Sequence, residues 1–214
     1  AHAQKGRRLV FVSSFKVNGV GRAGPYTVAD LPAPVDPYGI SNFEAENVLT
    51  GLAVSTGLEV VILRPPLVYG PEVKANFLQL IKLINRGIPF PFAGVKNQRS
   101  MIFLENLVDA LVMCAIHPAA AGNTFLVSDG KDISTPQLFK MISSALGKPA
   151  RVFTLSPGFL RLLGKAAGKS GTVSKLLDSL IVDSTKIRTL LGWELPFSME
   201  EGLKETVSWY QQTL

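Results

Sequence analysis

The sequence is poor in cysteine and lacks long apolar runs, and each shortage excludes a class of protein. Cys114 is the one cysteine among 214 residues, so the chain forms neither an internal disulfide nor a cysteine-rich zinc site. That count fits a reducing compartment, and we expect the cytoplasm. The longest apolar runs, 58–63 and 109–116, are too short or too interrupted to span a bilayer, which argues against an integral membrane segment. His2 and His117 lie outside all motifs, and we predict no metal site.

Organised positive charge is also missing. Lysine and arginine number 22 against 16 acidic residues, a net charge of +6, but they are scattered along the chain. No aromatic residues are interleaved with them, as a stacking platform for bases would require. We therefore expect no nucleic-acid partner and instead a small anionic ligand, such as a nucleotide diphosphate. With 47% hydrophobic and 18% charged residues, the chain is a well-buried globule rather than a disordered tail.

Strand-like and helix-like patterns alternate along the first 130 residues. Apolar, β-branched runs predict strands at 9–12, 59–63, 101–103 and 124–127, and apolar periodicity predicts helices at 39–55, 77–84 and 106–116. This alternation predicts an α/β fold with a doubly wound parallel sheet. After Gly130 the pattern changes to capped helices, beginning at Ser134-Thr135-Pro136 and continuing at 183–191 and 198–210. We predict a sheet domain over 1–130, with insertions around 71–100, and a smaller, mainly helical lobe over 131–214.

A serine pair and a tyrosine form the first candidate constellation. Ser13 and Ser14 end the strand at 9–12, and ligands of open parallel sheets bind at the carboxyl ends of the strands. A serine in that place is, on its own, most often a turn or helix-cap residue. Tyr38 opens the next helix, 24 residues after Ser14, and on its own it reads equally well as an exposed surface aromatic.

Further segments complete the pattern. They are Leu63-Arg64-Pro65-Pro66-Leu67-Val68-Tyr69-Gly70-Pro71 after a strand, Gln98-Arg99-Ser100 ahead of 101–110, and a tail with Asp183-Ser184-Thr185-Lys186 and Leu191-Gly192-Trp193. Taken together with the serines and Tyr38, these segments resemble the extended short-chain dehydrogenase/reductase family over nearly the whole chain. That family includes NAD-dependent nucleotide-sugar epimerases and dehydratases, and the resemblance implies a Rossmann-like sheet with a substrate lobe.

The resemblance also implies a function. We expect an NAD- or NADP-dependent enzyme acting on a UDP-sugar, similar to UDP-glucose 4-epimerase, working as a homodimer in surface polysaccharide biosynthesis. A reductase of 4-keto sugar nucleotides is an alternative from the same family. By the family's pattern, Ser14 positions the substrate oxygen and Tyr38 exchanges the proton of the sugar hydroxyl. The implied cofactor-side residues are Ser13, Tyr38, Asn42, Pro65 and Val68, and the implied substrate-side residues are Asn76, Phe77, Phe92 and Arg99.

Several of these residues have a structural alternative. Arg99 would pair with a phosphate, for which a planar guanidinium suits bidentate contact, or it would be a surface ion-pair partner. Phe92 would stack on the nucleobase or belong to the core, and Asn76 would contact the nucleotide diphosphate or cap a helix. A basic amphipathic stretch at 159–165 and 175–177 also fits a membrane-surface module, although such a stretch more often packs beside a cleft or a subunit interface.

Position 42 departs from the family's pattern. Tyr38 is followed four residues later by Asn42, where the family carries lysine. A phenol has a reference pKa of about 10, so near neutral pH only about one in a thousand is phenolate unless a neighbour stabilises the anion. Asparagine can hydrogen-bond a ribose hydroxyl but carries no charge. Asn42 therefore favours a second alternative, a catalytically silent family member that binds a nucleotide without turnover.

The second departure is a missing glycine-rich turn. The family's Gly-x-x-Gly-x-x-Gly segment, which binds the pyrophosphate at a helix N-terminus, does not occur in the sequence. The string at 19–24 matches Gly-x-Gly-x-x-Gly, but it lies in a proline-rich loop at 19–37 where we predict no helix. We therefore expect the chain to be the carboxyl-terminal two-thirds of such an enzyme, an N-terminally incomplete Rossmann-like sheet with its substrate lobe.

Overall fold

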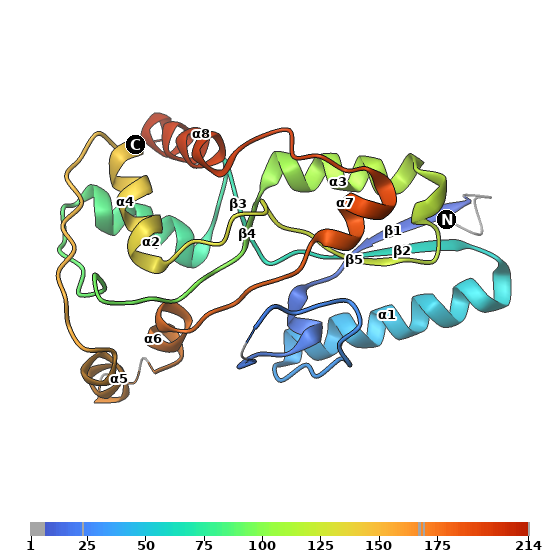
Figure 1. Ribbon diagram of the computed structural model, residues 1–214, viewed down its shortest axis with the longest axis horizontal. Helices are drawn as coiled ribbons and strands as arrows, with labels where there is room; N and C mark the ends of the chain where they lie inside the picture. The colour runs from blue at the N-terminus through green and yellow to red at the C-terminus, as the bar shows by residue number, and fades with distance from the viewer. Residues whose placement is uncertain (1–6, 23, 167, 169, 214) are drawn as a thin grey trace.

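The computed structural model describes residues 7–22, 24–166, 168 and 170–213, and Figure 1 shows the path of the chain. The strands are β1 (Arg8–Val12), β2 (Glu59–Arg64), β3 (Leu67–Tyr69), β4 (Met101–Phe103) and β5 (Thr124–Leu126). The α-helices are α1 (Pro37–Thr56), α2 (Ala75–Asn85), α3 (Leu104–Ile116), α4 (Thr135–Ala145), α5 (Pro157–Ala166), α6 (Ser170–Leu177), α7 (Thr185–Leu191) and α8 (Met199–Gln212). Two 3-10 helices, η1 (Phe15–Asn18) and η2 (Pro118–Ala120), complete the elements, and each strand and helix predicted from the sequence is present.

The central sheet is parallel, in the order β1-β2-β5. Leu9 of β1 lies opposite Val60 of β2, and Leu63 of β2 lies opposite Phe125 of β5. Helix α1 covers one face of this sheet, and α3 and α7 cover the other (Figure 1). The predicted α/β fold with parallel strands is thereby confirmed. A second parallel pair, β3 with β4, was not predicted, because three residues after two prolines are too short to show a strand period.

Strand β2 shows why its apolar run is continuous. Side chains alternate between the two faces of a strand, and both faces of β2 are covered. Val61 and Leu63 pack in the cluster with α3 and α7, whereas Val60 and Ile62 pack against Leu49 and its neighbours on α1. A polar residue at any of these positions would enter a covered face, so the run is apolar throughout.

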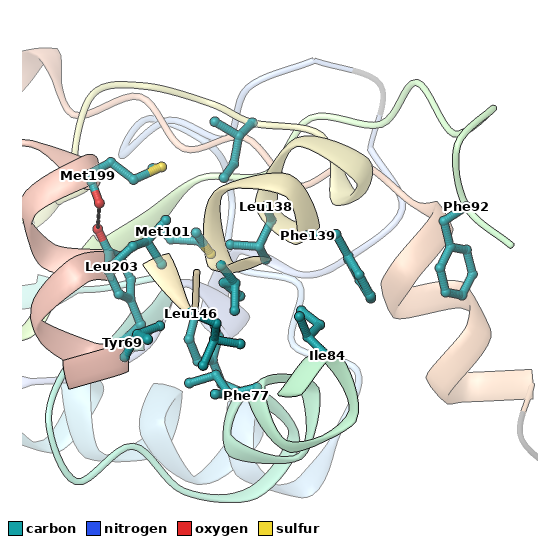
Figure 2. Close-up of a cluster of buried hydrophobic side chains, with 14 of the residues drawn as sticks. Tyr69, Phe77, Ile84, Phe92, Met101, Leu138, Phe139, Leu146, Met199 and Leu203 are labelled. Atoms are coloured by element: carbon teal, nitrogen blue, oxygen red, sulfur yellow. Dashed lines mark hydrogen bonds between the residues drawn. The ribbon is translucent and has the colours of Figure 1, made fainter. Parts of the chain in front are cut away.

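The largest hydrophobic cluster lies outside the central sheet. It joins β3, β4, α2, α4 and α8, and Figure 2 shows Tyr69, Phe77, Phe139 and Leu203 among its members. Helix α7 belongs instead to the cluster of the central sheet, through Ile187 and Leu191. Packing therefore interleaves the first 130 residues with the later ones, and the domain boundary at residue 130 stays a prediction.

Helix α1 carries Tyr38 and has a strongly specified start. The Asp36 side chain accepts a hydrogen bond from the Gly39 backbone N–H at 2.7 Å, and Pro37 is the first helical residue. The predicted loop at 19–37 is one residue too long, because Pro37 belongs to α1 and proline's fixed φ suits the first turn of a helix. In the described part of the loop, no helix lies between η1 and α1, and the rejection of the glycine string at 19–24 stays a prediction.

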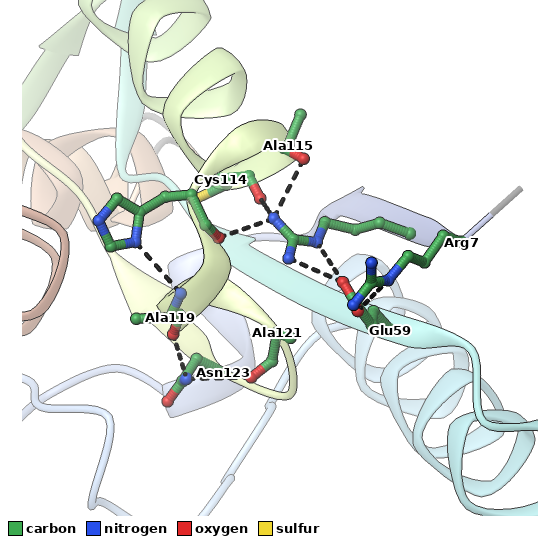
Figure 3. A network of polar contacts seen from close by, with 9 residues as sticks. Arg7, Glu59, Cys114, Ala115, Ala119, Ala121 and Asn123 are labelled. Carbon is green, nitrogen blue, oxygen red and sulfur yellow. Dashed lines mark hydrogen bonds and ion pairs between the residues drawn. The ribbon is translucent and has the colours of Figure 1, made fainter.

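An arginine pair fixes the amino-terminal end of the sheet. Arg7 and Arg8 each form an ion pair with Glu59 at 2.7 Å, and these guanidinium groups hold the pKa of Glu59 below its usual range. The Arg8 side chain also donates to the carbonyls of Cys114 and His117 at the end of α3, as Figure 3 shows in part. Cys114 is fully buried in the core, and burial raises the pKa of its thiol to about 12.

Candidate active site

The carboxyl ends of β1 and β2 are joined by backbone hydrogen bonds. The Ser13 N–H donates to the Leu63 carbonyl at 2.7 Å, and the Phe15 N–H donates to the Pro65 carbonyl at 3.1 Å. Parallel strands end on the same edge of their sheet, so Ser13, Ser14 and Pro65 come together there. The sequence predicted this meeting, since ligands of such sheets bind at that edge.

Ser14 is positioned by the short helix that it caps. Its backbone is extended, with φ −150° and ψ 147°, and its Oγ accepts a hydrogen bond from the Lys16 N–H at 3.3 Å. The side chain is 7% exposed. The turn-or-cap alternative is therefore correct for the local structure. A cap role leaves the hydroxyl proton available to a second partner, because the Oγ acts here as an acceptor.

Ser13 is tied into a buried polar network. Its hydroxyl lies 2.5 Å from Oε1 of Glu46, a residue in the middle of α1. The guanidinium of Arg64, at the end of β2, donates to both oxygens of Glu46, with Nε at 2.9 Å, and to Asn18 of η1 at 3.0 Å. Glu46 and Arg64 are 4% and 6% exposed. This network holds α1 and η1 against the ends of β1 and β2.

Tyr38 lies in the first turn of α1 and is 57% exposed. Its ring faces Lys16 of η1, whose Nζ is 5.4 Å from the ring centroid. The same ammonium forms an ion pair with Asp36, the helix cap. Ser14 and Tyr38 therefore both contact Lys16, one through its backbone N–H and the other through its side chain, and their catalytic roles stay predictions.

Asn42 follows Tyr38 by one helical turn. Its Nδ2 donates to the backbone carbonyl of Tyr38 at 2.8 Å. The amide is thus directed along its own helix, in the i to i−4 pattern of short polar side chains. It offers the Tyr38 phenol no positive charge.

The segment after β2 lines an open hollow. Val68 lies on β3 and Asn76 in the first turn of α2, and both border this hollow together with Leu104. The helix cap is Lys74 rather than Asn76, so the capping alternative for Asn76 is wrong. Glu72 and Ala75 have φ of 63° and 52°, a left-handed conformation that costs energy for residues other than glycine.

Phe77 and Phe92 belong to the hydrophobic core. Phe77 is 4% exposed and stacks on Tyr69 with ring centroids 5.8 Å apart. Phe92 is 7% exposed, and its centroid lies 6.1 Å from that of Phe139 (Figure 2). The core alternative therefore describes Phe92 in this structure. A role for either ring beside a nucleotide stays a prediction.

Arg99 lies where three segments meet. Its backbone exchanges hydrogen bonds with Ile133, at 2.9 and 3.2 Å, and its Nη1 donates to the Asp178 carbonyl at 3.1 Å. Burial lowers the pKa of the guanidinium, and the charge of Asp178 opposes that effect. Arg99, which lies just before β4, thus contacts the segment after α6. It is far along the chain from Tyr38 and Asn42 of α1.

Sequence reasoning did not single out Lys16, Glu46 or Arg64 for these roles. The sequence around Glu46 gave no signal, because α1 carries polar and apolar residues on all sides and only Gly39 and Glu46 are buried on it. Arg64 ends an apolar strand run, and a charged side chain that is buried there needs an oppositely charged partner. Lys16 had no signal, because its position over Tyr38 depends on the fold of the loop between them.

In the described part of the chain, no helix is long and apolar enough to cross a membrane. Among the same described residues, no group of three or more His, Cys, Asp or Glu side chains is placed to hold a metal ion.

Comparison with known proteins gives a consistent result. The sequence model of the NAD dependent epimerase/dehydratase family matches residues 1–128. A UDP-glucose 4-epimerase of Vibrio cholerae is 44% identical over 209 residues, covering 96% of this chain and 64% of the relative. The chain therefore spans less than two thirds of the length of that relative. An N-acetyl-alpha-D-glucosaminyl-diphospho-ditrans,octacis-undecaprenol 4-epimerase of Escherichia coli O157:H7 is 26% identical and covers 95% of this chain and 65% of the relative.

Solved structures share the fold. A UDP-glucose 4-epimerase of Thermotoga maritima, solved with UDP-glucose, superposes with a TM-score of 0.73 at 25% identity, covering 97% of this chain and 64% of that one. A UDP-glucuronic acid 4-epimerase of Bacillus cereus, solved with NAD, gives a TM-score of 0.77 at 20% identity, covering 96% and 62%. The second likeness shows the fold alone.

Proposed function

The chain belongs to the NAD-dependent epimerase/dehydratase family, and from that premise we propose that it carries the acid/base tyrosine and the substrate lobe of an NAD(P)-dependent UDP-sugar 4-epimerase. The observation that supports this most is that Ser14 and Tyr38 both contact Lys16, while the neighbouring Phe15 N–H donates to the Pro65 carbonyl at the carboxyl edge of the central sheet. The proposal extends to a homodimer in the cytoplasm acting in surface polysaccharide biosynthesis, as the resemblance implies.

The donor set at this edge fits the nicotinamide end of the cofactor. Pro65 and Val68 offer apolar surface for a flat ring, and the Asn42 amide suits a ribose hydroxyl. Ser13 contributes through its backbone, because its hydroxyl is held by Glu46. When bound, the cofactor accepts a hydride from the sugar carbon and returns it.

The residues of this chain carry out the proton chemistry. The Ser14 hydroxyl donates a hydrogen bond to the sugar oxygen and fixes its position. Tyr38 takes the hydroxyl proton as the carbon is oxidised and gives it back when the carbon is reduced, so the reaction has no net change in protons. A phenol that is 57% exposed can meet a sugar hydroxyl without rearrangement of the fold.

The proposal is tested by incubating the protein with NAD and UDP-galactose and measuring UDP-glucose. Interconversion that is lost in Tyr38→Phe and reduced in Ser14→Ala is the expected result, with a general acid/base worth about 10²–10⁴-fold. Reduction of a 4-keto sugar nucleotide by NADPH, without interconversion, would replace the epimerase by the reductase. Binding of both UDP and NAD without any turnover would favour the silent member that Asn42 suggests.

We predict that the 214-residue chain by itself binds NAD weakly. Its sequence contains no glycine-rich turn to bind the pyrophosphate, and Ser14, Tyr38 and Pro65 contact only the other end of the cofactor. Calorimetric titration should give a dissociation constant above about 1 μM, a free energy weaker than about −8 kcal/mol. Sub-micromolar affinity would contradict the prediction, because it would require a pyrophosphate site elsewhere in the chain.

Arg99 is predicted to bind a phosphate of the nucleotide. Arg99→Ala should weaken UDP binding by about 1.5–3 kcal/mol, the range for a hydrogen bond to a charged group. Arg86→Ala removes the same charge from the exposed end of α2 and should leave UDP affinity unchanged. A thermal unfolding curve of each variant separates lost affinity from lost structure. An equal UDP dissociation constant in folded Arg99→Ala would remove Arg99 from the site.

A further inference from the structure

Lys16 supplies a positive charge beside Tyr38, which Asn42 does not. Its Nζ is 5.4 Å from the centroid of the Tyr38 ring, whereas Asn42 directs its amide to the backbone carbonyl of Tyr38. We propose that Lys16 is the cationic partner of Tyr38 and stabilises its phenolate during the reaction. The inference rests on the proposed function, in which Tyr38 is the acid/base. Lys16 acts through Tyr38 and is therefore a positioning residue.

The placement of Lys16 is fixed at both ends. Its backbone N–H is held by Oγ of Ser14 at 3.3 Å, and its ammonium is paired with Asp36, two residues ahead of Tyr38. Asp36 is in turn fixed as the cap of α1 through the Gly39 N–H. In Figure 1 the segment after β1 lies against the start of α1, so these contacts join two neighbouring elements. The ammonium is thus held near the ring rather than free to extend into solvent.

The charged groups on β2, the strand packed against α1, have partners of their own. On β2, Arg64 is paired with Glu46 of α1, and Glu59 is paired with Arg7 and Arg8 at the opposite end of the strand. Glu44 is exposed on α1. Asp36 is the one acidic group at the start of the helix, and its charge opposes that of Lys16. The interactions of Tyr38 with both charges strengthen when substrate and cofactor displace water and the effective dielectric constant falls.

The tyrosine content makes the effect measurable without substrate. The chain has four tyrosines, of which Tyr26, Tyr69 and Tyr210 are at most 4% exposed and Tyr38 is 57% exposed. Burial also raises the pKa of Tyr69. In a pH titration followed by phenolate absorbance, a first transition that is missing in Tyr38→Phe belongs to Tyr38.

Lys16→Gln should move the midpoint of this first transition up by about 0.3–1 pH unit, the scale of one charge at this distance near a surface. Lys16→Arg should restore it, and 1 M salt should reduce the difference. Lys140→Gln removes the same charge from α4, far from α1 in Figure 1, and should leave the midpoint unchanged. An unchanged midpoint in Lys16→Gln, or an equal change in Lys140→Gln, would overturn the proposal.

A second variant, at Asp36, should move the Tyr38 midpoint in the opposite direction. Asp36→Asn keeps a good helix cap but removes the opposing charge, so the Tyr38 midpoint should fall. A midpoint that stays or rises would also overturn the proposal, even if Lys16→Gln does not fold. In the active protein, the acidic limb of the rate profile should move with the absorbance midpoint in each variant. A shifted midpoint without turnover in any variant supports the Lys16 contact and contradicts the proposed function, whereas turnover without a shifted midpoint contradicts the Lys16 contact alone.

Discussion

Glu46→Ala is expected to lower the free energy of unfolding by about 3–5 kcal/mol, the range for removing one partner of a buried ion pair. Glu46 is 4% exposed and accepts hydrogen bonds from Arg64 and from Ser13. Without it, the Arg64 guanidinium would stay buried with one hydrogen bond, to Asn18, and its charge would be unmatched. A loss of this size is a large share of the stability of an ordinary domain, which is about 5–15 kcal/mol.

The measurement is urea unfolding followed by circular dichroism. Glu44→Ala is the matched control, since Glu44 is exposed two residues away on α1, and its change should stay within about 0.5 kcal/mol. The double variant Glu46→Met with Arg64→Met removes both charges and should recover most of the loss, because an apolar pair of similar volume needs no partner. Equal stability of Glu46→Ala and Glu44→Ala would show that Arg64 reaches water and that the network is not buried in solution.

The sequence determines much of this fold because its elements have clear periods and boundaries. The run at β2 is apolar because both of its faces are covered, and Ser134 with Gln137 forms a capping box that marks the start of α4. The short strand β3 could not be predicted, since Leu67–Tyr69 is ordered by pairing with β4, some thirty residues away in sequence. A segment of only three residues shows no strand period, and its sequence does not identify the strand with which it pairs.

The candidate site was predictable in part, because some of its residues lie at element boundaries that the sequence shows. Ser14 lies just after β1 and Tyr38 lies in the first turn of α1, so the element boundaries in the sequence predict where each of them lies in the fold. The contact of Lys16 with Tyr38 depends on how the loop at 19–37 folds, and no local pattern specifies it. Phe92 shows the converse difficulty, because an aromatic residue between prolines reads equally well as a stacking surface and as core, and only packing against Phe139 distinguishes the two.

Asn42→Lys is expected to raise turnover at neutral pH by about 10- to 1000-fold. An ammonium one helical turn from Tyr38 stabilises the phenolate, and an opposite charge at such a distance typically shifts a pKa by about one to three units. Lys16 leaves room for this gain, because its charge is shared with Asp36 and Tyr38 is open to solvent. The hydrogen bond that Asn42 gives to the Tyr38 carbonyl is lost, at little cost on a helix surface.

The pH profile identifies the cause of that gain. The base must be deprotonated, so its stabilisation moves the acidic limb of the rate profile to lower pH, and turnover at pH 9–10 should change far less than turnover at pH 7. Ser41→Lys adds the same charge to the neighbouring exposed position and Asn42→Gln adds none, and neither should move the limb. In the Asn42→Lys background, Lys16→Gln should have a smaller effect than in the natural chain, because two cations then act on one phenol. Equal profiles for the natural chain and Asn42→Lys would mean that Tyr38 is already fully activated, and the size of the Lys16→Gln effect would then show whether Lys16 is responsible.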